Sequence, residues 1–303
     1  MIEEPPVPPL AALESLAVPG GSDTGTGIPG RARSERVLRV LAYAAMIAIS
    51  LLYFIPFLWT VSTSLKTLPE TAFFSLIPKH WTVQAYHDVW TNYNFARYIE
   101  NSAGVSIAIT AITLVVAGLG GYAFARLRFP GREILFFAVL ATLMVPDQLR
   151  LVPVYEMLVK WQLINTYTGY VLVKLGLATS LFLMRQYFLT IPKDLEEAAK
   201  LDGAGYFKTF WRVMLPLAGP ALAAVTILEF QGAWNDFFWA SLLLQTPDHY
   251  TVQIGLAQFI FQYGTEWPKL MAASVIAIAP IAAVYLVFQR YFVAGVASAG
   301  VKG

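Results

Sequence analysis

Long apolar stretches without a charged residue alternate with short polar segments along this chain. No Asp, Glu, Lys or Arg occurs between Arg39 and Lys66, between Glu100 and Arg126, or between Lys269 and Arg290. A helix needs about 20 predominantly apolar residues to cross the hydrocarbon core of a bilayer. Each of these three regions therefore predicts one complete transmembrane helix.

Three further apolar regions, residues 134–146, 166–188 and 217–244, bring the predicted number of transmembrane helices to six. Charges follow or interrupt them, in the pairs Asp147 and Arg150, Lys174 and Arg185, and Glu229 and Asp236. We expect the first of these regions to extend past Asp147, and the third to fifth helices to have less regular ends. The pattern predicts an all-α polytopic membrane protein.

The composition agrees with a membrane location and excludes several functional classes. Of the 303 residues, 57% are hydrophobic and 13% charged, whereas soluble domains carry about 25% charged residues. The net charge of +2 is too small to indicate nucleic-acid binding. Because the chain has no cysteine, disulfides are excluded. The three histidines are scattered, and neither a clustered metal-ligand spacing nor a nucleophile motif occurs.

The apolar runs also suggest how the chain is organised. The segment before the first run is rich in Pro, Gly and small polar residues, which is typical of disorder. The expected parts are a disordered tail (1–30), a first transmembrane helix (31–66), an external loop (67–100), a transmembrane core (101–292) that contains a mixed polar loop (189–216), and a C-terminal tail (293–303).

Basic residues predict the orientation of the chain. With six spans, fourteen of the 21 Lys and Arg residues fall on the side that carries both termini and the 189–216 loop, and six fall on the other. Cytoplasmic loops are enriched in Lys and Arg. We therefore expect a multi-pass protein of a bacterial-type plasma (inner) membrane, with both termini in the cytoplasm.

The 189–216 loop predicts two short helices. Asp194, Glu196 and Glu197 place negative charge where the dipole at the start of a helix favours it, and Gly203 suits its C-terminal cap. A second helix is expected from about Tyr206 to Met214. Two interpretations are open from the residues alone: an amphipathic hairpin in the lipid headgroups, or a docking surface for a cytoplasmic partner.

The loop resembles a known motif. The order Glu197-Ala198-Ala199, Gly203, Val213 and Leu215-Pro216 resembles the EAA loop of ABC importer permeases, although the family pattern has Ile where this chain has Val213. Three stretches, "LEEAAKLDGAG" with Asp202, "WNDFFW" at Trp234–Trp239 and the ending from Gln289, resemble the smaller membrane subunit of maltose-type sugar importers. The resemblance covers residues 37–303.

This resemblance implies a type I ABC importer permease whose loop docks in a cleft of an ATPase. The residues expected to carry that coupling are Glu197, Ala198, Ala199, Asp202, Gly203, Leu215 and Pro216. The chain has no GxxxxGK[ST] motif, so a partner would bind Mg and ATP and hydrolyse the ATP. This chain would then be neither an enzyme nor a cofactor-binding protein.

The implied partners are a second, larger permease subunit, a cytoplasmic ATPase dimer, a periplasmic or lipid-anchored sugar-binding protein, the sugar and membrane lipids, without nucleic acid. The outer segments 152–170 and 245–270 would form the platform for the binding protein, or simply pack on the outer leaflet. The tail residues Gly300, Val301, Lys302 and Gly303 would insert between the ATPase subunits, or form a frayed terminus.

Ionisable residues inside a membrane usually face a partner or a water-filled path. Glu229 and Asp236 are seven residues apart, so on one helix they would share a face. Similar counted depths predict that Lys174 and Glu229 pair directly or through water. The residues expected to line a translocation path are Lys174, Glu229, Gln231, Trp234, Asn235 and Asp236. The alternatives are that these charges only join helices, and that Trp234 and Trp239 belong to an interfacial aromatic belt.

Two other functional classes remain open from the residues themselves. An ion-coupled secondary transporter could use Glu229 and Lys174 as a relay, but it would be expected to show inverted repeats, and no clear repeat is present. A membrane-embedded enzyme would need a catalytic motif, and none is recognisable in the sequence.

Overall fold

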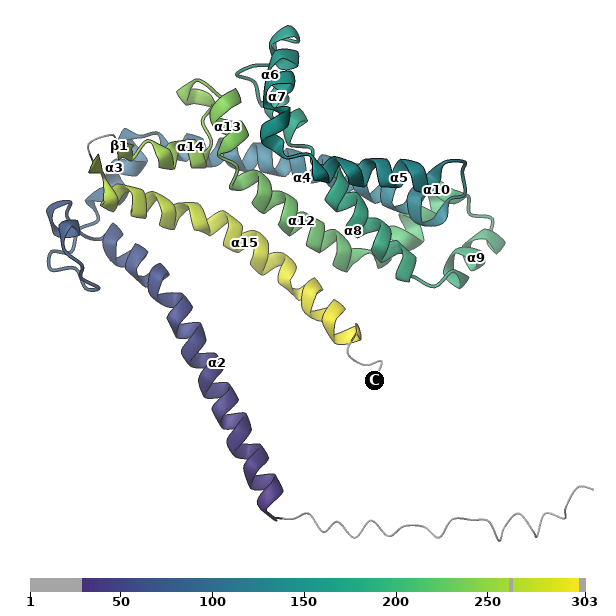
Figure 1. The fold of residues 1–303 in the computed structure, drawn as a ribbon, viewed down its shortest axis with the longest axis horizontal. Coiled ribbons are helices and arrows are strands. Elements are labelled where there is room, and N and C mark those ends of the chain that lie inside the picture. The colour runs from purple at the N-terminus through teal and green to yellow at the C-terminus, as the bar shows by residue number, and fades with distance from the viewer. Residues whose placement is uncertain (1–28, 262–263, 300–303) are drawn as a thin grey trace, which may run out of the picture. The chain divides into compact units, whose positions relative to one another are not determined.

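The computed structural model describes residues 29–261 and 264–299, and these residues are predominantly helical (Figure 1). The first helix, α2 (Pro29–Ser64), contains Pro56, and the chain divides there into two compact units, Met1–Pro56 and Phe57–Gly303. The start of α2 agrees with the predicted first span to within two residues. Residues 1–28 of the predicted tail and Gly300–Gly303 lie outside the described part of the chain.

Long helices form the body of the second unit (Figure 1). The central one is α4 (Phe95–Arg126), which packs along α8 (Leu177–Thr190) and α12 (Gly219–Trp234). On the other side, α12 packs on α15 (Trp267–Ala299). Because lipid tails are as apolar as these side chains, close packing of small residues has to hold such helices together.

Glycine allows the closest of these approaches, between α4 and α8. A Cβ atom built on Gly121 would lie 2.6 Å from the Cβ atom of Met184 and 2.9 Å from the backbone nitrogen of Arg185. Any side chain at Gly121 would therefore force the two helices apart. Gly104, nearer the start of α4, has no atom within 4 Å of such a Cβ. Close packing therefore requires glycine at Gly121 but not at Gly104.

Three helices of the described residues are long and apolar enough to cross a membrane, and up to six spans result if each of three bent pairs is one span. The bends are 95° between Arg132–Met144 and Asp147–Lys160, 49° between Tyr167–Lys174 and Leu177–Thr190, and 77° between Tyr206–Leu217 and Gly219–Trp234. The three clean spans and the irregularity of the others agree with the charge pattern.

Shorter elements complete the second unit. Of these, α3 (Gln84–Asn92), η5 (Pro247–His249) and α14 (Val252–Ala257) contact α4. The same unit contains η1 (Pro69–Ala72) and the paired strands β1 (Ile260–Phe261) and β2 (Gly264–Thr265). The bent third region consists of α5 (Arg132–Ala141), η2 (Thr142–Met144), η3 (Asp147–Arg150) and α6 (Leu151–Lys160). The rest are α7 (Tyr167–Lys174), α9 (Asp194–Leu201), α10 (Tyr206–Thr209), the π-helix η4 (Phe210–Met214), α11 (Leu215–Leu217) and α13 (Phe238–Leu243).

Three expected boundaries differ from the structure. Residues 67–100 are not only a loop, because they contain η1, α3 and the first turn of α4. The helix α15 continues to Ala299, so the chain is still helical where a tail was expected to start at 293. The expected fifth span, 217–244, is interrupted, since α12 ends at Trp234 and α13 begins at Phe238.

Candidate functional site

The α9–α11 segment (Asp194–Leu217) confirms the two short helices expected in the polar loop. Acidic residues occupy the first turn of α9, and Gly203 follows its end with φ +74°. The backbone N–H of Ala204 donates to the carbonyl of Ala199 at 2.9 Å and that of Gly203 to Lys200 at 3.0 Å. Glycine adopts this left-handed conformation without a steric penalty, which makes it a suitable helix terminator.

The two sides of α9 differ in exposure. Glu196 and Ala199 are buried, whereas Glu197, Ala198 and Asp202 are exposed. Glu197 and Ala198 lie next to each other, and the large apolar side chain of Leu201, one turn later, is 90% exposed. This side of α9 is therefore accessible to another protein.

The second half of the segment is anchored in the protein core. Phe210 and Met214 are at most 2% exposed and pack with Tyr122, Phe188 and other buried residues of α4, α8 and α12. The Phe210 ring lies 5.3 Å from that of Tyr122. A π-helical stretch, which the helical spacing did not predict, connects α10 with Leu215 and Pro216 at the entry to α12. The exposed face of α9 is thus attached to the helix bundle.

A buried ion pair, missed in the sequence, holds α9 against α4. The Nε atom of Arg126, the last residue of α4, lies 3.0 Å from Oε1 of Glu196, and the two side chains are only 4% and 11% exposed. The Arg126 guanidinium also donates to the carbonyl of Ile191, just before α9. The available signal was that Arg126 closes a charge-free run and needs a partner as it leaves the membrane.

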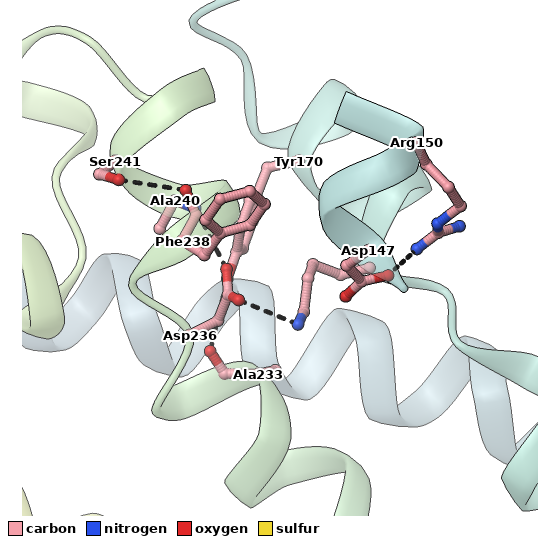
Figure 2. A network of polar contacts seen from close by, with 9 residues as sticks. Asp147, Arg150, Tyr170, Ala233, Asp236, Phe238, Ala240 and Ser241 are labelled. Atoms are coloured by element: carbon pink, nitrogen blue, oxygen red, sulfur yellow. Dashed lines mark hydrogen bonds and ion pairs between the residues drawn. The ribbon is translucent and has the colours of Figure 1, made fainter. Parts of the chain in front are cut away.

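A second polar network surrounds Asp236, between α12 and α13 (Figure 2). Its Oδ2 accepts hydrogen bonds from the Tyr170 hydroxyl and from the backbone N–H of Ala240, both at 3.1 Å. Its Oδ1 accepts from Nζ of Lys174 at 3.1 Å, and the Asp236 side chain is only 9% exposed. Figure 2 also shows the ion pair of Arg150 with Asp147, at the beginning of the second half of the 95° bend.

The structure changes two expectations about these charges. Lys174 pairs with Asp236 rather than directly with Glu229, whose carboxylate accepts from the Ser180 hydroxyl at 2.5 Å, and a bridge from Lys174 to Glu229 through water stays a prediction. Glu229 and Asp236 share no helical face, because α12 ends at Trp234. The expectation assumed a straight helix through both residues. The chain instead leaves the axis of α12 after Trp234, two residues before Asp236.

The structure brings only some of the expected path residues together. Gln231 and Asn235 are exposed, and Asn235 accepts from the Gln253 amide at 3.3 Å. Trp234 and Trp239 are each 1% exposed in separate apolar clusters. Neither indole is available at a surface, so neither the sugar-contact nor the aromatic-belt interpretation fits this structure.

Polar side chains near the start of α4 bind the segment around α14. The Asn101 amide donates to the carbonyls of Asp248 and Tyr250 at 2.8 and 2.9 Å, and the Ser102 hydroxyl accepts from the backbone N–H of Val252 at 2.8 Å. Among residues 29–261 and 264–299, no group of three or more His, Cys, Asp or Glu side chains could hold a metal ion.

Known proteins resemble this chain over most of its length. The arabinooligosaccharides transport system permease protein of Halalkalibacterium halodurans is 40% identical over 206 residues, which cover 68% of this chain and 74% of that protein. The diacetylchitobiose uptake system permease protein of Streptomyces coelicolor is 34% identical over 275 residues, covering 89% and 90%.

A solved structure and a family model agree with these relatives. A chain from a bacterial ABC transporter involved in the import of the acidic polysaccharide alginate superposes with a TM-score of 0.76 at 26% identity, covering 86% of this chain and 98% of that one. The model of the binding-protein-dependent transport system inner membrane component matches residues 115–298, more than half of the chain. The chain therefore belongs to the family of binding-protein-dependent transport system inner membrane components, the ABC importer permeases that its EAA-like loop resembles.

Proposed function

We propose that this chain is one of two permease subunits of an ATP-driven importer for a sugar or related solute, and that α9 couples it to a separate ATPase. One observation carries the coupling role: α9 exposes Glu197 and Ala198 on one side, while Glu196 on its other side is held in the protein. A surface helix attached in this way can pass on the movement of a partner. The relatives named as saccharide permeases support the substrate class.

The proposed assembly follows from the basic-residue bias and the family. The α9 end and both termini would lie in the cytoplasm, where an ATPase dimer binds and hydrolyses ATP with Mg. A second, larger permease would complete the translocation path, and a periplasmic or lipid-anchored binding protein would deliver the solute at the α14 end. The tail Gly300–Gly303 would reach the ATPase dimer. This chain itself would bind no cofactor.

Transport in this proposal is alternating access. ATP binding would close the ATPase dimer and move the α9–α11 segment, and the bundle would follow by a shift in the populations of two states. The polar groups at the helix breaks suit a solute path, because sugar hydroxyls hydrogen-bond to carboxylates and amides. Gln231 and Asn235 are exposed and Glu229 is partly exposed, so these three would line the path, and Lys174 with Asp236 would border them.

The experiment is a co-purification of the tagged chain from its native membrane in mild detergent, followed by mass spectrometry. We expect a second permease and a Walker-motif ATPase. Gly203→Ala should lower the ATPase yield, because φ +74° is strained for alanine and α9 would end differently. The matched control is Gly205→Ala, since Gly205 has φ −74° and no atom within 4 Å of a new Cβ. A wild-type chain that purifies without any ATPase would contradict the proposal.

A further inference from the structure

We infer that α4 carries the movement of the α9–α11 segment to the opposite end of the bundle, and that the Arg126–Glu196 ion pair joins the two for this purpose. Arg126 and Glu196 would be positioning residues for coupling. The inference rests on the proposed function, and it assigns the mechanical connection to a helix that is not adjacent in sequence to the coupling segment.

The first step is the connection at the α9 end. Arg126 contacts this part of the chain twice, through the Glu196 carboxylate at 3.0 Å and through the Ile191 carbonyl. One contact lies just before α9 and the other within its first turn, so together they restrain the start of this helix. Separating two charges that are buried to this degree would leave each without compensation, which is strongly unfavourable. The start of α9 and the end of α4 should therefore move together.

The second step is the continuity of α4. It runs from Phe95 to Arg126 as one helix of 32 residues without an internal proline, a length of about 48 Å at 1.5 Å per residue. The connection through the backbone is different. From α11 the chain bends by 77° into α12, which ends after 16 residues at Trp234. The backbone also joins the segment to α8, which spans 14 residues and meets α7 at a 49° bend. Of these routes out of the α9–α11 segment, α4 is the one that reaches the other end of the bundle unbroken.

The third step is the connection at the opposite end. Asn101 binds two backbone carbonyls, those of Asp248 and Tyr250, and Ser102 accepts from the N–H of Val252. The side-chain oxygen Oδ1 of Asn101 also accepts from the Tyr167 hydroxyl at 2.7 Å. A Cβ atom on Gly255 would lie 2.4 Å from the ring of Tyr98, so α14 packs directly on α4. Displacement of α4 would thus move the 248–255 segment, part of the proposed platform for the binding protein.

The test uses the complete complex in proteoliposomes with its binding protein and solute. The variants are Arg126→Gln, Glu196→Gln and the reversed pair Arg126→Glu with Glu196→Arg. The matched control is Glu133→Gln, which removes a half-exposed ion pair to Arg185 at 2.9 Å just beyond the end of α4. The measured quantities are the yield of assembled complex, the basal ATPase rate, and its stimulation by the solute-loaded binding protein.

We expect each single variant to assemble and to keep its basal ATPase rate, while stimulation by the binding protein falls about tenfold, within the usual range of coupling between sites. The reversed pair should recover part of this stimulation, which a loss of folding would not do. Asn101→Ala, at the other end of α4, should lower stimulation in the same way.

Wild-type stimulation in both single variants would overturn the inference while leaving the proposed function intact. Equal loss of stimulation in Glu133→Gln would also overturn it, because the effect would then not be specific to the buried pair. A wild-type complex that binds no ATPase would instead refute the proposed function. If the single variants do not assemble, Asn101→Ala tests the inference instead. Unchanged stimulation of the ATPase in that variant would contradict transmission through α4.

Discussion

Two ion pairs of similar length occupy regions of opposite character in this protein. Arg126 and Glu196 join the end of an unbroken helix to the surface helix α9. Lys174 and Asp236 instead join two interruptions, because Lys174 is the last residue of α7 before a 49° bend and Asp236 lies between α12 and α13. The first pair connects rigid elements, and the second connects places where the backbone already changes direction.

The partners of each carboxylate sharpen this difference. Asp236 has two further donors, the Tyr170 hydroxyl and the Ala240 N–H, so it stays partly satisfied if Lys174 leaves. Among the described residues, the Glu196 side chain has Arg126 as its sole ion-pair partner. The Lys174–Asp236 pair can therefore open at a modest cost in free energy, whereas opening the Arg126–Glu196 pair leaves buried charges without compensation.

The largest expected effect separates the two pairs directly. Arg126→Leu should lower the free energy of unfolding by about 3–5 kcal/mol, because Glu196 would remain buried without a partner. Lys174→Met should lower it by only about 1–2 kcal/mol, since Asp236 keeps its other donors. Thermal unfolding of the purified chain in detergent would measure both. Equal losses of unfolding free energy in the two variants would show that Asp236 depends on Lys174 as much as Glu196 depends on Arg126.

A second effect concerns the packing of α4 against α8. Gly121→Ala should cost about 1–3 kcal/mol, because the new methyl group would overlap Met184 and the backbone of Arg185. Gly104→Ala on the same helix has free space and should stabilise by about 0.5–1 kcal/mol through helix propensity. The same unfolding measurement applies. If Gly121→Ala is as stable as Gly104→Ala, the α4–α8 contact is looser than the structure indicates.

A third effect concerns the hydrogen-bond donors to Asp236 at the helix breaks. Tyr170→Phe removes one donor to Asp236 and keeps the ring, so it should cost about 0.5–1.5 kcal/mol. Combined with Lys174→Met, the loss should exceed the sum of the single losses, because Asp236 would keep a single donor. A double-mutant cycle in unfolding free energy measures this excess. Strict additivity would mean that the three side chains do not act as one network.

The smallest effect concerns a polar contact outside both regions. The pKa of Glu70 lies below its usual value, chiefly because the backbone N–H of Lys79 donates to its carboxylate at 2.5 Å. A lowered pKa in the folded state means that this stabilisation is complete above the usual glutamate pKa and is lost as the pH falls through the lower folded value. Protease cleavage within residues 67–83 should therefore rise slightly in acid, and Glu70→Gln should abolish that pH dependence.

Local signals made much of the fold predictable. Charge-free runs located α2, α4 and α15, because a membrane helix must be apolar along its whole length. The start of α9 and its glycine terminator were also readable, since helix ends depend on residues within one or two turns. The same reasoning failed at Asp236, where a break in the helix replaced the expected continuous face.

The partners of the charges, by contrast, depended on the assembled bundle. The sequence by itself determined a helical membrane protein whose polar loop of two short helices resembles the EAA loop, since hydropathy and short motifs are properties of neighbouring residues. Only the tertiary structure decided that Arg126 meets Glu196, that Lys174 meets Asp236, and that Trp234 is buried. These contacts join residues far apart in the chain, and they depend on the rotation and bending of each helix, which local pattern does not specify.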